Sequence, residues 1–179
     1  MSLQGAVDPK QAPRLTALTK PENDATTRVC ATSLLGTIQG PEADAALAEL
    51  KNDNDRRVRF QALHALAKRG SEGRKAFMDL WKQPDTTPAE RGDIVNVLSG
   101  GSISDSIMIF MDAVRNTQLD ESVRILAAQT LGRVGNQSAL QILNECAEKD
   151  SSEKVRAAAK TAAEAVSARL NKAAVAPGS

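Results

Sequence analysis

Residues 53–66, DNDRRVRFQALHAL, hold a pattern that recurs along most of the chain. The arginine of this stretch, Arg59, has counterparts at steps of 31 to 33 residues, and an acid or its amide stands six positions before each one. A small or apolar residue follows each arginine by three positions. The arginines are Arg28, Arg59, Arg91, Arg124 and Arg156, and the residues six positions earlier are Glu22, Asp53, Asp85, Gln118 and Asp150. Self-similarity at a fixed period indicates one supersecondary unit copied about five times.

Each copy has the sequence pattern of two helices. In the second copy, a polar cluster at 52–55 is typical of a turn with a helix cap, and apolar residues follow at helical spacing over about 56–68. Gly70 ends this first helix, and a second helix covers about 71–82 before Pro84 blocks its continuation. The fourth copy repeats the plan at about 121–134 and 138–148. No window alternates as a strand does, so the pattern predicts an all-α protein.

The same pattern sets the expected boundaries. We predict an N-terminal extension with a half-repeat helix at 1–20, a repeat array at 21–168 and a C-terminal tail at 169–179. The units of the array are 21–51, 52–83, 84–116, 117–149 and 150–168. The extension lacks the first helix of a unit, and the last unit, with a helix over about 152–174, lacks the second. Two explanations stay open: the half-units cap the array, or the chain is a segment of a longer repeat protein.

Composition narrows the expected partners. Lys and Arg number 23 against 22 Asp and Glu, so the net charge of +1 gives no long-range field toward nucleic acid or an acidic membrane. Aromatic residues make up 2% of the chain, which leaves few platforms for base stacking. No apolar stretch is long enough to span a membrane. We therefore predict no nucleic-acid partner, no membrane insertion and a cytoplasmic location.

The residues that usually carry chemistry are scarce. The single histidine, His64, belongs to a polar stripe on the first helices and is expected to be a solvated surface residue. One histidine cannot supply a multi-histidine metal site, and no other motif suggests a catalytic triad. Cys30 and Cys146 lie in different copies and are predicted to be reduced, buried thiols. We predict no catalytic residue, no metal and no cofactor.

Two segments carry a family resemblance. VRFQALHAL at 58–66 and VRILAAQTLG at 123–132 resemble HEAT repeats, and they look most like the short bacterial kind also found in phycobilin lyases. The third copy departs most from that pattern, with Glu90, Arg91, Gly92 and Ile94. The resemblance covers about residues 21–168. It implies an α-α superhelix, a right-handed solenoid of about five helical hairpins, in which the second helices line the concave face.

The resemblance also implies a role for the recurring acids and arginines. In such repeats they are structural, and we predict that each acid faces the arginine of its own unit or of the neighbouring unit. The predicted ladder comprises Asp53, Arg59, Asp85, Arg91, Arg124, Asp150 and Arg156. The alternative is an anion site built from the stacked arginines.

One candidate surface stands out among the second helices. We align the predicted second helices on the residues expected to face inward, which are Leu47, Phe77, Ile107 and Leu140. In this alignment, large flexible side chains occupy adjacent positions in the second and third copies. These residues, here named the methionine–tryptophan patch, are Met78, Trp81, Met108 and Met111, with Asp79, Lys82 and Asp112 as a polar rim. Methionine and tryptophan are common on surfaces that accept peptides, but the same side chains also fill gaps between helices. Both interpretations stay open.

The functional hypothesis that follows is a non-enzymatic protein-interaction scaffold. It would bind a partner peptide or protein on the concave face, with the methionine–tryptophan patch as the contact. An alternative, based on the family resemblance alone, is a bilin-chromophore lyase or a lyase-like subunit. A spacer segment of a larger protein is a third possibility. The sequence leaves the oligomeric state and the identity of the partner open.

Overall fold

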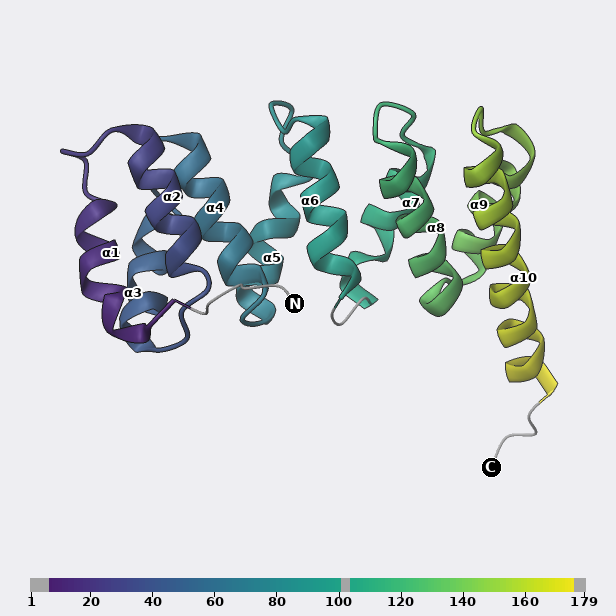
Figure 1. Ribbon diagram of the computed structural model, residues 1–179. Coiled ribbons are helices and arrows are strands. Elements are labelled where there is room, and N and C mark those ends of the chain that lie inside the picture. The colour runs from purple at the N-terminus through teal and green to yellow at the C-terminus, as the bar shows by residue number, and fades with distance from the viewer. Residues whose placement is uncertain (1–6, 101–103, 176–179) are drawn as a thin grey trace, which may run out of the picture. The chain divides into compact units, whose positions relative to one another are not determined.

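The computed structural model describes residues 7–100 and 104–175, and the regular secondary structure in this part of the chain is entirely helical (Figure 1). This confirms the predicted all-α helical-repeat fold. The first helices of the repeats, named A helices, are α2 (Ala25–Leu35), α4 (Arg56–Ala67), α6 (Pro88–Ser99), α8 (Glu121–Val134) and α10 (Glu153–Val175). The second helices, named B helices, are α1 (Ala12–Leu18), α3 (Pro41–Leu50), α5 (Ser71–Leu80), α7 (Ile107–Arg115) and α9 (Gln137–Lys149). Short 3-10 turns at Pro9–Gln11 and Ser104–Ser106 precede α1 and α7.

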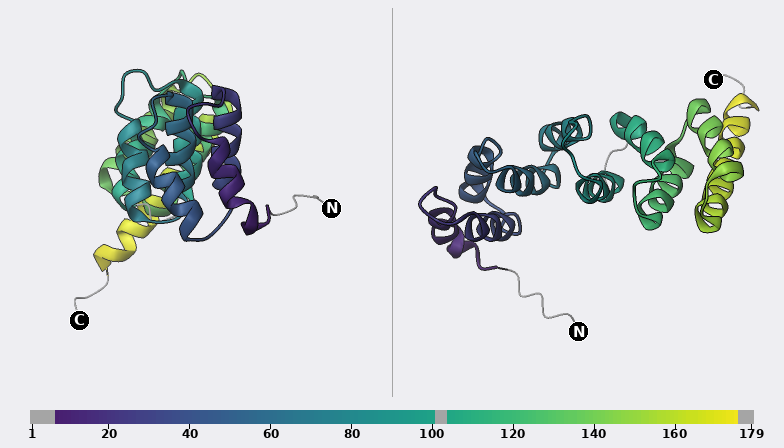
Figure 2. Two further views of the ribbon diagram at one scale, coloured as in Figure 1. Left: turned by 90° about the vertical axis from the view of Figure 1, so that its left-hand side faces the viewer. Right: turned by 90° about the horizontal axis from the view of Figure 1, so that it is seen from above.

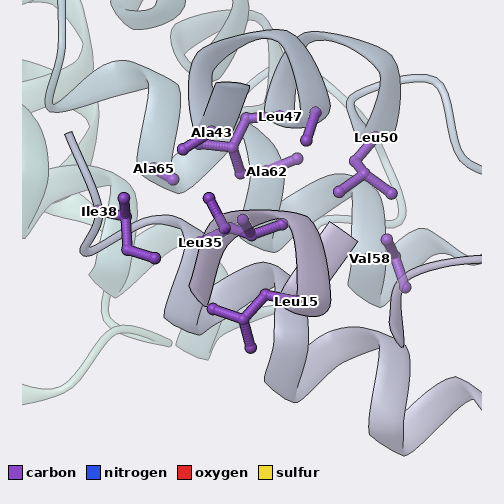
Figure 3. Packing of buried hydrophobic residues seen from close by; sticks show 11 residues of the cluster. Leu15, Leu35, Ile38, Ala43, Leu47, Leu50, Val58, Ala62 and Ala65 are labelled. Atoms are coloured by element: carbon purple, nitrogen blue, oxygen red, sulfur yellow. The ribbon is translucent and has the colours of Figure 1, made fainter. Parts of the chain in front are cut away.

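The chain divides into two compact units, Met1–Asp79 and Leu80–Ser179. In the first unit, α2 packs against α1, α3 and α4, and α3 packs against α4. Leu35 and Leu47 are fully buried at the centre of this unit, and Figure 3 shows them with Leu15 and Ala62 in one apolar cluster. Because these side chains are aliphatic and small, the core is filled without large rings.

Helix α5 joins the first unit through the side chain of Phe77 and through the close approach of Gly73 to the backbone of Leu66 in α4. Phe77 is its only buried residue, and the ring centroid of Phe77 lies 5.4 Å from that of Phe60 and 5.8 Å from that of His64. His64 is therefore half-buried against two phenylalanine rings, so its prediction as a solvated surface residue was wrong. The spacing of the polar stripe did not reveal that a ring from the next helix reaches over it.

In the second unit, α8 occupies the middle. It packs against α6, α7 and α10, while α9 packs against α7 and α10. The interior is formed by Leu98, Phe110, Leu131, Leu143 and Val166, all with no exposed surface. Helix α10 extends beyond α8 and α9 at its C-terminal end, which is visible in Figure 1 and in the left view of Figure 2.

Neighbouring A helices approach closely where a glycine faces a small residue. A Cβ added at Gly36 would lie 2.9 Å from the Cβ of Ala65, and one added at Gly132 would lie 3.1 Å from that of Ala162. Both glycines stand eight positions after a repeat arginine, Arg28 or Arg124. In these two repeats the Leu-Gly step therefore allows the next A helix to approach closely; the corresponding positions of the second and third repeats hold Ala67 and Ser99.

Side chains cap the first turns of α2, α4 and α6, and the cap of Asp55 lies in the polar cluster predicted at 52–55, whereas Asp120 before α8 makes no such bond. Asp24 and Asp55 accept hydrogen bonds from backbone N–H groups in the first turns of α2 and α4, and Thr87 and Glu90 form a reciprocal capping box on α6. These local bonds fix where these three helices begin, which explains why the helix positions could be predicted from sequence.

Asp55 gives a first testable prediction. The hydrogen bond from the Arg57 side chain, followed by that from the Arg57 backbone, lowers the pKa of Asp55 from its ordinary value of 3.8 to about 2. Because the folded-state pKa is depressed, the contribution of this carboxylate to stability is complete above pH 3.8 and is lost as the pH falls through about 2. Arg57→Ala should raise the pKa toward 3.8 but not fully, since the backbone bond remains. A ¹³C NMR pH titration of the carboxyl measures this, and identical midpoints in both proteins would contradict it.

Candidate functional site

The repeat acids pair with the arginine of the preceding repeat. Arg28 Nη2 pairs with Asp53 Oδ2, and Arg124 Nη2 lies 3.3 Å from Asp150 Oδ1. The side chains of the second pair are only 6% and 4% exposed. The sequence left open whether each acid side chain faces the arginine of its own repeat or that of a neighbouring repeat. In both described pairs, the carboxylate faces the arginine of the neighbouring repeat.

The backbone of the same acids accepts bonds from the arginine of their own repeat. Arg59 Nη1 donates to the carbonyl oxygen of Asp53 at 2.6 Å, and Arg156 Nη1 donates to that of Asp150 at 2.7 Å. Each of these acids therefore connects two successive arginines, one through its carboxylate and one through its carbonyl group. Such charge-assisted bonds join consecutive repeats at the N-terminal ends of the A helices.

A second set of arginines caps the opposite ends of the A helices. Arg69 donates to the carbonyl groups of Leu35, Gly36 and Ile38 at the end of α2 and pairs with Asp44. Arg169 donates in the same way to carbonyl groups of Gly132, Arg133 and Gly135 at the C-terminal end of α8. The last carbonyl groups of a helix lack intrahelical donors and carry partial negative charge, so a guanidinium satisfies both needs. The predicted ladder did not include these residues, although arginines that recur near the ends of the A helices are a signal visible in the sequence.

The ladder changes at Arg91. Asp85, in the acid position of the third repeat, is exposed in the turn before α6 and takes part in an interaction of its own. The residue that should face Arg91 from the fourth repeat is Gln118, an exposed amide. The Arg91 guanidinium carbon instead lies 5.3 Å from the centre of the Trp81 ring. The buried Nε of Arg91 has no hydrogen-bond acceptor among the described residues.

The methionine–tryptophan patch is unevenly exposed. Trp81 and Met111 are only 7% and 6% exposed, Met78 is half-buried, and Met108 is 61% exposed. The rim residues Asp79, Lys82 and Asp112 are all exposed. Met78 and Asp79 belong to the first unit and the others to the second.

Burial corrects the alignment behind that patch. The largest fully buried side chain of each B helix after α1 is Leu47, Phe77, Phe110 or Leu143, whereas Ile107 and Leu140 are only half-buried. The register of α7 and α9 is therefore one helical turn later than the sequence alignment had it. In the corrected register Met111, not Met108, corresponds to Met78, and Val114 corresponds to Trp81.

The fourth repeat contains a polar pocket that the sequence did not predict. It measures about 490 Å³ and is lined by Arg115, Thr117, Glu145, Cys146, Lys149 and Asp150. Arg115 Nη2 lies 3.3 Å from Glu145 Oε2 across it. Burial raises the pKa of the Cys146 thiol, which therefore stays protonated at neutral pH. Both cysteines are free; Cys146 is buried as predicted, but Cys30 is exposed, so that part of the prediction was wrong.

An apolar groove of about 640 Å³ lies between α8 and α10. Its walls are formed by Leu126, Gln129, Thr130, Gly132 and Arg133 of α8 and by Ala157, Ala158, Thr161, Ala162 and Ala165 of α10. The small side chains of α10 leave this space open.

The described residues contain neither a metal-binding cluster nor a membrane-spanning helix. No group of three or more His, Cys, Asp or Glu side chains there is arranged to hold a metal ion. None of the helices described combines the length and apolarity needed to cross a membrane.

Comparison with known proteins agrees with the repeat geometry. The model of the HEAT repeats matches residues 11–88 and 82–164, which together cover most of the chain. The search among curated proteins found no match. Because the matched ranges contain the paired helices, the arginine ladder and the close A-helix contacts, the chain belongs to the HEAT-repeat family.

Proposed function

We propose that the protein is a non-enzymatic interaction scaffold that binds a partner peptide or protein segment on its B-helix face. HEAT repeats typically mediate protein interactions and are generally non-catalytic, which supports the general class. The observation that carries the finer proposal is Met108. At 61% exposure it is the most exposed large apolar side chain of the described residues, ahead of Leu34 at 42%.

Met108 stands on a helix that is held rigidly. Phe110 and Val114 of α7 have no exposed surface, so the helix is anchored on one side while Met108 points to solvent. A flexible thioether on a fixed backbone adapts to different apolar partners without ordering the main chain at the moment of binding. This arrangement favours binding over gap filling at this one position.

The surroundings of Met108 define the chemistry of the partner. Asp112 and Arg115 follow it by four and seven positions, and all three side chains are exposed along one face of α7. Arg115 is already paired with Glu145, and Asp112 lies one helical turn after Met108 on this face. We propose a partner segment with an apolar residue for Met108 and a basic residue for Asp112.

The other residues of the methionine–tryptophan patch and its rim differ in burial and in the unit to which they belong. Trp81 and Met111 support the surface from below because they are buried. Lys82 belongs to the polar rim of the second unit. Met78 and Asp79 belong to the first unit, and the site proposed here uses the second unit alone.

The test is a peptide-display selection against the purified chain, followed by titration of the enriched peptides. We expect an apolar residue flanked by Lys or Arg, and Met108→Ala should weaken the binding of such peptides about tenfold, or about 1.4 kcal/mol. Leu34→Ala, which removes an exposed apolar side chain from the A helix α2, is the matched control and should leave affinity unchanged. Peptides that bind the Met108 variant as tightly as the wild type would refute the assignment of the site.

The lyase alternative has weaker support. A bilin site would need a pocket lined by a cysteine or an acid, and the fourth-repeat pocket contains Cys146, Glu145 and Asp150. The thiol, however, is buried with a raised pKa, and Asp150 is paired with Arg124. Neither group is prepared for reaction, so we do not adopt this function.

A further inference from the structure

We propose that Arg91 binds a carboxylate supplied by a partner protein, at the one ladder position where the chain itself provides an amide. The ladder arginines Arg28 and Arg124 each direct Nη2 to an aspartate of the next repeat. The residue in that position for Arg91 is Gln118, which stands six residues before Arg124 just as Asp150 stands six before Arg156. The position that holds an aspartate in the described ladder pairs therefore holds a neutral glutamine opposite Arg91.

The environment of Arg91 is that of an incompletely compensated cation. Its guanidinium lies over the ring of Trp81, whereas the guanidinium of Arg124 is paired with Asp150. The Nε of Arg91 is buried without an acceptor among the described residues, as is that of Arg124, so the difference between the two arginines lies in the missing carboxylate. Cation–π contact offsets part of the cost of removing a guanidinium from water, but a buried N–H group without an acceptor still costs free energy. Arg91 remains half-buried, whereas Arg124 with its aspartate is only 5% exposed. A bound carboxylate would supply the missing counter-charge.

The geometry of the intact ladder positions indicates which carboxylate fits. Asp53 Oδ1 accepts a bond from the N–H of Asp55, and Asp150 Oδ1 accepts one from the N–H of Ser152, both at 2.8 Å. In both cases the ligand of the arginine is an aspartate at the start of a tight turn, held by an N–H two residues later. We therefore assign the site to an aspartate in a turn of a partner protein rather than to a free small carboxylate.

This site shares Trp81 with the methionine–tryptophan patch but goes beyond the scaffold proposal. It uses Arg91, Trp81 and Gln118, and it requires neither Met108 nor Asp112. A negative result at one site therefore leaves the other untouched.

Trp81 provides the readout because it is the only tryptophan of the chain and lies against Arg91. The probe is an acetylated and amidated peptide with the sequence of residues 148–154, EKDSSEK, which is the turn that presents Asp150 to Arg124. Titrated at constant ionic strength, it should change Trp81 fluorescence saturably with a midpoint in the range of about 1–10 mM. The matched peptide with asparagine in place of this aspartate should bind at least tenfold more weakly.

Variants separate the site from non-specific effects. Arg91→Gln should weaken the response at least tenfold, and Gln118→Asp should do the same because the chain would then supply its own acid. Met108→Ala is the control that keeps the full response, and circular dichroism checks that each variant is folded. The absence of a saturable response in the wild type, its persistence in Arg91→Gln, or an unchanged response in Gln118→Asp would each overturn the proposal. Glutarate that binds as tightly as the peptide would overturn the assignment to a partner protein.

Discussion

Asp150→Ala should lower the free energy of unfolding by about 3–5 kcal/mol, because it leaves the buried guanidinium of Arg124 without its counter-charge. Arg124 is 5% exposed, and its Nε already lacks an acceptor among the described residues, so no solvent compensates the loss. The substitution also removes the acceptor for the N–H of Ser152 at the start of α10. Both losses act at the junction of the fourth and fifth repeats.

Urea denaturation followed by Trp81 fluorescence measures this effect, since Trp81 belongs to the same unit as Asp150. The matched control is Glu145→Ala. It breaks the Arg115–Glu145 pair, whose side chains are both 49% exposed, and should cost at most about 1 kcal/mol because water screens such a pair. Equal shifts of the urea midpoint for the two variants would show that burial of the ladder pair does not determine its contribution.

Phe77→Ala should destabilise the attachment of α5 to the first unit by about 3–5 kcal/mol, the usual cost of removing a buried phenyl group. Phe77 has no exposed surface and is the only buried residue of its helix, so no neighbouring side chain of α5 can take over its contacts. Its loss also leaves His64 and Phe60 without the ring that covers them. We expect α5 to open locally before the rest of the unit unfolds.

Hydrogen exchange resolved to residues 71–80 is the appropriate measurement. Protection of these amides should fall in the Phe77 variant, while amides of α2 and α3 keep most of theirs. Asp79→Ala, at an exposed position of the same helix, should change stability by less than about 0.5 kcal/mol. Unchanged protection of α5 in the Phe77 variant would mean that contacts other than the aromatic cluster hold this helix.

The sequence by itself determined the repeat and the positions of its helices. The predicted helices at 56–68, 121–134 and 138–148 correspond to Arg56–Ala67, Glu121–Val134 and Gln137–Lys149. Their ends depend on local interactions, such as the N-terminal caps of Asp55 and Asn136, and therefore lie within reach of sequence reasoning. The fixed spacing of the arginines predicted the repeat units, since a residue that recurs once per repeat occupies the same place in each copy.

Only the tertiary structure decided which side of each B helix faces inward. The run Ile107–Met111 is apolar on nearly every side, so helical periodicity gives two registers one turn apart. Packing against α8 and α9 places Phe110 and Met111 inside and leaves Met108 exposed. The pairing within the ladder was also decided by the tertiary structure. The sequence predicts which acids and arginines recur, but not which repeat supplies the partner of each arginine. Burial and pairing are properties of contacts between helices distant along the chain, and a local pattern does not specify them when several side chains of similar character are available.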